Sequence, residues 1–280
     1  MPKSSQTIPK SKPAAPLLSK RVQKKITLAD PKSTRGRTAN KPKPSNPGWR
    51  KENLVLGGLI KQATVLLEAL FVKHNMPESH GIDHCTKVLS HMKQTILARN
   101  HSLDLTLTRK IALLLGALLH EADDHKYFGK ESQNALDILR QVLENRPTVE
   151  RNSIIKECLE CISMVSTADN GNSIPPMAKK MPELLWVRFC DRLEAVGKTG
   201  VVRCWQYNVE KGVTPLCLPE TTPRPKTADQ VWKFATKERF QNYMRVKDSA
   251  SMMDHYYDKL LHIVETDVNI TKNMYLVSQA

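Results

Sequence analysis

The chain has 280 residues, of which 40% are hydrophobic and 25% are charged, and its net charge is +15. Fourteen of the 43 Lys and Arg residues lie in residues 1–51, where Asp30 is the only acid, so this segment carries +13 and the remainder only +2. The basic character therefore belongs to the N-terminal segment, and the composition argues against a basic nucleic-acid-binding body.

Residues 1–50 form a Lys- and Pro-rich segment that holds eight of the 17 prolines and has no sustained apolar periodicity. Such a segment cannot bury enough surface to order itself, so we predict a disordered tail. A nuclear address, or a weak attraction for nucleic acid, polyphosphate or a membrane surface, remains an alternative, with KRVQKK (20–25) as the best local candidate. We find no secretory signal and expect no bilayer-crossing run, hence no membrane association.

The body, residues 51–280, reads as helical from Glu52 onward, because apolar residues recur there at three- and four-residue spacing. Within residues 106–121 the run from Ile111 through Leu119 has no polar side chain, which predicts a central buried helix. Strand signals are scarce, so we predict one all-α domain, a helical bundle. The expected helices are 52–71, 82–99, 106–121, 131–144, 149–166, 182–193, 197–210, 228–244 and 249–268.

The six cysteines are scattered along the body. Cys158 and Cys161 form a single CxxC, which alone could indicate redox or zinc chemistry. Cys158 shares a predicted helical face with Ile162 and Val165, however, and a second CxxC is absent. We interpret the cysteines as reduced core residues, which favours the cytoplasm or the nucleus.

Four side chains of metal-ligand type follow or interrupt apolar helical stretches: His84, His120, Glu121 and Asp191. Burying acids at the end of the most apolar helix is costly unless something neutralises them, and a divalent cation does so. His84 by itself could equally be a structural hydrogen-bonding residue. Mixed imidazole and carboxylate ligation suits Mn²⁺, Fe²⁺, Co²⁺, Ni²⁺ or Zn²⁺ better than Ca²⁺.

These residues resemble the H…HD…D signature of the HD-domain phosphohydrolases, a metal-dependent superfamily. The resemblance covers about 77 to 268 and is closest to a subgroup of small bacterial-type nucleotide (pyro)phosphohydrolases. Its ordered blocks here are SHGIDH (79–84), LLHEADDHKYF (118–128), CDRLEAVG (190–197), GVVRC (200–204) and HYYDKLL (255–261).

The resemblance implies an all-α fold with His84, His120, Glu121 and Asp191 as metal ligands. It also implies hydrolysis of nucleotides supported by Mn²⁺, with Mg²⁺, Co²⁺, Ni²⁺ or Fe²⁺ as alternatives. One departure stands out, since Glu121 occupies the position of the family's second doublet residue, an aspartate. Either the site accepts the longer carboxylate, or catalysis has been reduced or lost.

The resemblance also suggests roles around the metal. Asp124, three residues after Glu121, takes the place of the general acid/base and is expected on the same helical face. Lys126 fits a catalytic phosphate-binding charge. Substrate contacts are expected from His80, Arg192, Arg203 and Lys259, although His80 could be a surface histidine and Arg192 could pair with Glu194.

The leading hypothesis is a metal-dependent phosphohydrolase that acts on a small phosphorylated substrate, a nucleotide, by metal-activated water. It includes nucleotidase and triphosphate pyrophosphohydrolase activities. One alternative is a catalytically impaired member that binds nucleic acid or another partner through its basic tail. Another is a phosphodiesterase. The sequence leaves base, sugar, metal and oligomeric state open.

Overall fold

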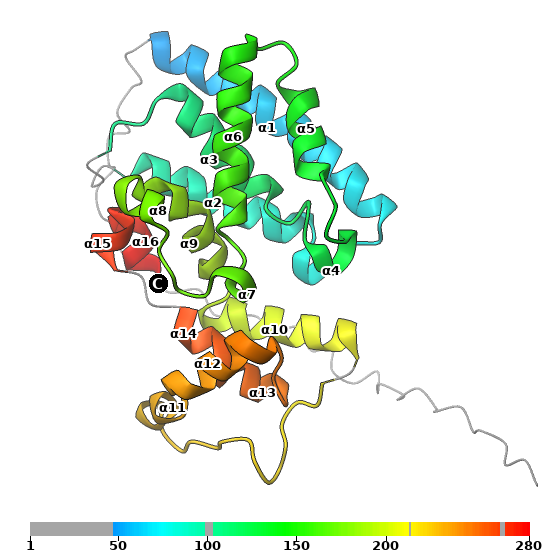
Figure 1. The fold of residues 1–280 in the computed structure, drawn as a ribbon, viewed down its shortest axis with the longest axis vertical. Coiled ribbons are helices and arrows are strands. Elements are labelled where there is room, and N and C mark those ends of the chain that lie inside the picture. The colour runs from blue at the N-terminus through cyan, green and yellow to red at the C-terminus, as the bar shows by residue number, and fades with distance from the viewer. Residues whose placement is uncertain (1–46, 99–102, 213, 264–266) are drawn as a thin grey trace, which may run out of the picture. The chain divides into compact units, whose positions relative to one another are not determined.

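A computed structural model describes residues 47–98, 103–212, 214–263 and 267–280, with side chains from residue 51 onward. Within these ranges the chain is helical and contains no strand, which confirms the predicted all-α class (Figure 1). The elements are α1 (Pro47–Lys73), η1 (Glu78–His80), α2 (Ile82–Leu97), α3 (Leu107–Leu119), α4 (His125–Phe128), α5 (Asn134–Val142), α6 (Thr148–Ser163), α7 (Thr167–Asn170), α8 (Pro176–Lys180), η2 (Pro182–Leu185), α9 (Trp186–Leu193), α10 (Gly197–Lys211), α11 (Ala228–Phe234), α12 (Lys237–Val246), α13 (Met252–His255), η3 (Tyr256–Leu260), α14 (Leu261–Ile263), α15 (Val268–Thr271) and α16 (Met274–Gln279).

Helix α3 is the centre of the main layer, and every residue from Ile111 to Leu119 is buried. A helix that is apolar on all sides needs neighbours on all sides, and α3 packs against α1, α2, α6 and α9. Gly116 faces α6 and α9, and a Cβ atom there would lie in van der Waals contact with them, 3.4 Å from Val187 and 3.6 Å from Cys161. The predicted central helix is therefore confirmed.

Helices α2 and α9 flank α3; α2 has one buried face, whereas α9 is buried almost all round. On α2 that face includes His84, Val88 and Met92 at helical spacing. On α9 nearly every residue is buried, and the indole nitrogen of Trp186 donates to the Thr271 carbonyl at 2.7 Å, which ties the C-terminal helices to the main layer. The ligand-bearing ends of these helices are thereby held by packing.

Residues 197–263 form a second, smaller layer beneath the main one in Figure 1. Its buried residues, such as Tyr243, Tyr257 and Leu260, are not part of the large apolar cluster of the main layer. A polar network holds this layer: Arg239 donates to Asp254 at 2.8 Å and to Asp258 at 2.6 Å. Helix α10 connects it to η1.

The boundaries differ from the predicted ones where local signals compete. Helix α1 starts at Pro47, four residues before the predicted start of the body, and residues 1–46 of the expected tail (1–50) lie outside the described residues. The expected helix 228–244 divides into α11 and α12, where Thr236 caps the second helix by accepting from the Arg239 amide. The short helices α4, α7, α8, α15 and α16 were not predicted, since each is too brief for a periodic pattern.

The sequence led us to expect no apolar stretch long enough to cross a membrane. By length and composition this expectation was wrong. Lys51–Lys73 of α1 is long and apolar enough to cross one by length and composition alone, and 17% of its apolar 18-residue stretch is buried. One face of α1 nevertheless packs on α3 and α5. All six cysteines are free, four buried and two partly buried, in agreement with the predicted core role.

Candidate metal centre

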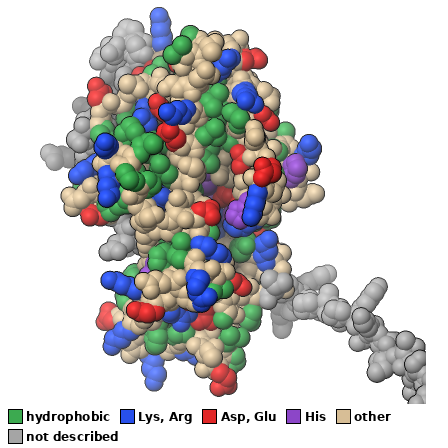
Figure 2. All heavy atoms as spheres, in the orientation of Figure 1, with side chains coloured by type: hydrophobic (Ala, Val, Ile, Leu, Met, Phe, Trp, Pro, Cys, Tyr) green, Lys and Arg blue, Asp and Glu red, His purple; other side chains and the backbone are tan. Residues whose placement is uncertain are grey.

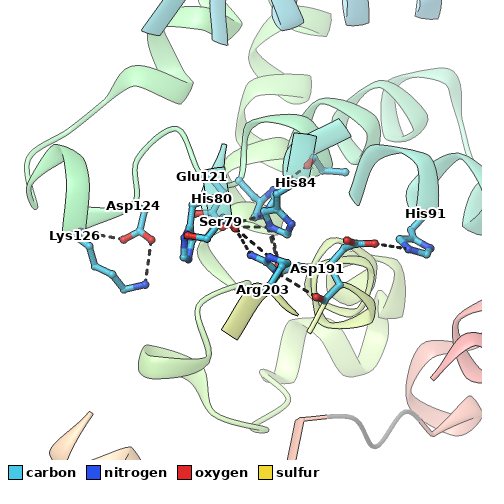
Figure 3. Close-up of polar contacts among 12 residues, drawn as sticks. Ser79, His80, His84, His91, Glu121, Asp124, Lys126, Asp191 and Arg203 are labelled. Atoms are coloured by element: carbon cyan, nitrogen blue, oxygen red, sulfur yellow. Dashed lines mark hydrogen bonds and ion pairs between the residues drawn. The ribbon is translucent and has the colours of Figure 1, made fainter. Parts of the chain in front are cut away.

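The four expected ligands converge from three elements of the main layer (Figure 3). His84 comes from the first turn of α2, and Asp191 comes from α9. His120 and Glu121 directly follow the last residue of α3. One donor atom from each of the four lies within 4.8 Å of the others. A cluster that the sequence divides by gaps of tens of residues is thus a single site.

The separations between donor atoms suit a bound cation. His84 Nε2 lies 3.1 Å from His120 Nε2 and 3.1 Å from Asp191 Oδ1. Glu121 Oε1 lies 3.5 Å from His84 Nε2 and 3.4 Å from His120 Nε2. Metal–ligand bonds of about 2.0–2.2 Å place neighbouring ligands roughly 3.0–3.6 Å apart in octahedral or tetrahedral geometry. The donor set therefore fits a divalent metal.

The electrostatics of the cluster also favour a cation. Burial raises the pKa of Glu121 and Asp191, but bonds and charge from the histidines outweigh it and hold both pKa values well below their usual range. Burial lowers the pKa of His120, yet the two carboxylates more than compensate and raise it to about 10. Glu121 and Asp191 thus keep a positive charge, that of the histidines, beside them. A bound metal ion would supply such a charge.

The two imidazoles are oriented differently. His120 Nδ1 donates to the Ala117 carbonyl at 2.9 Å, which fixes the tautomer and leaves Nε2 free to ligate. His84 Nδ1 is buried and has no hydrogen-bond partner among the described residues. In both histidines the short distances to the other members of the cluster are made by Nε2. Each ring therefore presents Nε2 to the centre of the site.

His80 lies beside the cluster, one turn before His84, with the ring centroids 6.5 Å apart. Its Nδ1 is 2.8 Å from Ser79 Oγ and 3.3 Å from the Tyr127 hydroxyl. Burial lowers the pKa of His80 to about 4, with Glu121 opposing and Lys126 among the groups that add to the shift. His80 is therefore neutral near pH 7, a hydrogen-bonding group rather than a cation.

Three cationic side chains act electrostatically on residues of the cluster or on one another. Lys126 comes from α4, Arg203 from α10 and Lys259 from η3. Lys126 interacts electrostatically with Glu121, and Lys259 interacts with Asp191, Lys126 and Arg203. Figure 2 shows basic, acidic and histidine side chains gathered where the two layers meet. Opposed charges converge there from both layers.

Lys259 is the most perturbed of these cations. Burial, together with Lys126 and Arg203, lowers the pKa of Lys259 to about 8, against an opposing effect of Asp191. It sits in η3, a wider π-type turn of the kind often found at functional sites, and its ammonium lies 5.7 Å from the Tyr243 ring centre. A buried ammonium among cations gains most from an added anion.

Arg203 has a partly structural role. Its Nε and Nη2 donate to the Ser79 carbonyl at 3.1 and 3.0 Å, and its Nη1 donates to the Glu194 carbonyl at 3.4 Å. Glu210, also on α10, accepts from the Ser79 amide at 3.1 Å. These bonds fasten η1, which carries His80, to the second layer. The charge of Arg203 still acts on the site.

The Arg192 side chain was expected to contact the substrate, but it bonds to the 171–172 loop instead. It is 5% exposed, and its Nη1 and Nη2 donate to Asn172 Oδ1 at 3.0 Å and to the Gly171 carbonyl at 2.6 Å. The pair with Glu194 that the sequence left open is not formed either. The cause is register, because residue 192 follows Asp191 by 100° around α9 and so faces the 171–172 loop. Arg192 is a tie between helix and loop.

Asp124 is also placed differently from the expectation of a shared helical face. Helix α3 ends before Glu121, and Asp124 has extended backbone angles as the N-cap of α4. Its carboxylate accepts from the Lys126 amide at 3.0 Å and from Lys126 Nζ at 3.2 Å (Figure 3). The neighbouring Asp123 caps the start of α5 by accepting from the Asn134 and Ala135 amides.

The sequence did not identify an aromatic group beside His80. The Tyr127 and Tyr207 ring centres lie 5.5 and 5.4 Å from that of His80. Lys211 Nζ lies 5.4 Å from the Tyr127 ring centre and 5.7 Å from that of Tyr207. A signal was present, since Arg203, Tyr207 and Lys211 recur every four residues and so share one face of α10.

An all-helical body that gathers two imidazoles and two carboxylates within 4.8 Å defines a helical protein with a metal-type ligand cluster. The chain belongs to the family of uncharacterized protein L803 of Acanthamoeba polyphaga mimivirus, to which it is 30% identical over 236 residues, or 79% of this chain and 90% of that protein. No family model matches the chain. A Lactobacillus plantarum crystal structure, a structural genomics target, is similar with a TM-score of 0.48 and 19% identity, over 78% of this chain and 88% of that one.

Proposed function

We propose that this protein is a metal-dependent phosphohydrolase of the HD-domain type that acts on small phosphorylated substrates, nucleotides above all. The observation that carries the proposal is the union of the four-ligand cluster with Lys126, Arg203 and Lys259 around its carboxylates. A ligand cluster alone fits many metal proteins. A cluster flanked by converging cations suits a substrate that brings several negative charges.

His84, His120, Glu121 and Asp191 would hold the metal, for which we favour Mn²⁺, with Mg²⁺, Co²⁺, Ni²⁺ or Fe²⁺ as alternatives. When bound, a metal of this kind activates water and polarises a phosphoryl oxygen. The ligand histidines and carboxylates are held by α2, α3 and α9, so the site is preorganised by the core.

The remaining residues bind and orient the substrate. Lys259 and Lys126 neutralise phosphate oxygens, and Arg203 adds charge while it holds η1 in place. Neutral His80 offers Nε2 for a hydrogen bond, because Nδ1 is engaged by Ser79 and Tyr127. Asp124 accepts from Lys126 at 3.2 Å. A phosphate that competes for Lys126 frees the Asp124 carboxylate to hold a proton of the attacking water.

The test is a hydrolysis screen of the purified full-length chain against nucleoside mono-, di- and triphosphates with each candidate metal. Product analysis for phosphate and pyrophosphate distinguishes a nucleotidase from a pyrophosphohydrolase. We expect turnover with at least one metal and a loss of about a hundredfold or more in His120→Ala. No turnover with any metal, or equal turnover in His120→Ala, overturns the proposal.

A matched control separates contamination and unfolding from loss of the site. His74→Ala removes an exposed imidazole that follows α1 and lies against the Phe128 ring, outside the cluster. This variant should retain both metal and activity. We further propose that the enzyme works in the cytoplasm or nucleus, which the free cysteines support.

A further inference from the structure

Helix α1 presents an apolar face that nothing covers among the described residues. Its inner face is fixed in the core, where Ala63, Leu67 and Phe71 are at most 5% exposed. On the opposite face Val65 is 56% and Val72 is 78% exposed. An exposed row of this length on a folded body usually marks an interaction surface.

The outward residues follow a heptad pattern. Val55, Gly58, Gln62, Val65, Ala69 and Val72, which we call the α1 seam, are all exposed and are separated alternately by three and four residues. Alternating three- and four-residue spacing keeps one stripe of a helix turned toward a single partner helix. The inward residues of α1 already serve the core, so the seam is a second and separate stripe.

The seam is complementary to itself when its direction is reversed. In an antiparallel pair Val55 lies opposite Val72 of the second copy, Gly58 opposite Ala69, and Gln62 opposite Val65. Each layer then joins residues of small or moderate size. A Cβ atom placed on Gly58 would meet nothing within 4 Å, which leaves open space for the backbone of a partner helix.

The charges beside the seam select the same arrangement. Lys61 and Glu68 each precede a seam residue by one position, and in an antiparallel pair such flanking positions meet each other. Lys61 of one copy then faces Glu68 of the other, twice by symmetry. Neither residue forms a salt bridge within the described ranges. In a parallel pair Lys61 would instead face Leu66, and this attraction would be lost.

We propose that the α1 seam is a homodimer interface in which two copies pack their first helices antiparallel about a two-fold axis near residues 63 and 64. The face is about 26 Å long from Val55 to Val72 at 1.5 Å per residue. A single helix face of this length gives an interface at the low end of the specific size range, so we expect a weak, concentration-dependent dimer. A lipid surface fits less well, because Lys61, Gln62 and Glu68 interrupt the middle of the face.

Charge reversal tests the register directly by sedimentation velocity of the full chain over a range of concentrations. Lys61→Glu alone and Glu68→Lys alone should each raise the dissociation constant about tenfold or more, because two symmetry-related pairs become repulsive. The double variant Lys61→Glu/Glu68→Lys should return to within about threefold of the native value. Lys179→Glu, an equal charge change on α8, should have no effect.

A native chain that is monomeric at every concentration overturns the proposal, and so does a dimer that ignores both single reversals. Direction is tested by mixing Val55→Cys and Val72→Cys chains under oxidation. A disulfide should form between the two variants and in neither variant alone, since Val55 and its own copy lie about 26 Å apart. Val55→Cys self-linkage above the native background indicates a parallel pair and overturns the register.

Flotation with neutral phosphatidylcholine vesicles examines the lipid alternative without attracting the basic N-terminal segment. If the native chain does not float with the vesicles, the result supports a second copy of the chain as the partner. Flotation that Val65→Glu abolishes would assign the face to a membrane and overturn the dimer.

Discussion

At the residue scale, the site is made of carboxylates and cations whose burial costs free energy. Glu121 reaches both imidazoles at 3.4–3.5 Å, so the longer side chain is a competent ligand. Its pKa is held well below the usual range despite burial. The geometry around Glu121 thus accommodates a glutamate where the HD-type pattern that we propose has an aspartate.

We expect Glu121→Asp to lower metal retention by about tenfold, because the shorter carboxylate withdraws from both imidazoles. Metal content after dialysis, measured by elemental analysis, checks this. Glu131→Asp, the same change at an exposed position, is the control. A higher metal content or a faster hydrolysis in Glu121→Asp would instead show that the native glutamate impairs the site.

We expect Lys259 to lower the free energy of unfolding, as a consequence of its proposed role in binding phosphate. Its pKa of about 8 lies below the ordinary value of 10.5, so between these values the unfolded chain binds more protons than the folded chain, and stability rises with pH. Below pH 8 the penalty is present in full. Lys259→Met should therefore raise the free energy of unfolding at pH 7 by roughly 1–3 kcal/mol.

Urea unfolding at pH 7 and pH 10 measures this effect, with Lys130→Met as the exposed control. The same variant should raise KM for a phosphorylated substrate. Native KM should rise above pH 8 as Lys259 loses its proton, whereas Lys259→Arg should keep KM flat. A stability gain without any change in KM would remove Lys259 from the substrate site.

At the scale of elements, the positions where helices end decide which residues reach the site. Helix α3 stops at Leu119, so His120 and Glu121 project together while Asp124 starts a new helix. Helix α9 continues through residue 193, so Asp191 faces the site and Arg192 faces the loop after α7. Neighbouring residues therefore serve different purposes.

Arg192→Met should lower the free energy of unfolding by about 1–3 kcal/mol, because it leaves the Gly171 carbonyl without its buried donor. KM for a phosphorylated substrate should stay within about twofold of native, since the guanidinium faces the loop. Thermal unfolding and steady-state kinetics on the same preparation separate the two roles. A raised KM with unchanged stability would return Arg192 to the substrate.

At the scale of the whole molecule, the site belongs to both layers. The ligands come from the main layer and Lys259 and Arg203 from the second, with Arg203 and Glu210 joined to η1 at Ser79. The first helix combines a core face with the α1 seam. Most of the net positive charge lies in residues 1–46, outside the described residues, so the proposed catalysis and any nucleic-acid binding would belong to different parts of the chain.

Deleting residues 1–46, which ends before α1, should leave metal content and hydrolysis unchanged. The same deletion should abolish any salt-dependent affinity for RNA, because it removes most of the positive charge. Fluorescence anisotropy with single-stranded RNA at low and high salt provides the measurement. RNA affinity that survives the deletion would place the binding surface on the helical body.

The sequence by itself determined the helical class, the central helix and the four residues of the metal-type cluster. Apolar periodicity reports burial directly, and acids that follow apolar helices need a neutralising partner. Only the tertiary structure decided the directions of Arg192 and Asp124, the aromatic group at Tyr207, and the free outer face of α1. Those outcomes depend on helix ends and on neighbours distant in sequence, which local patterns do not encode.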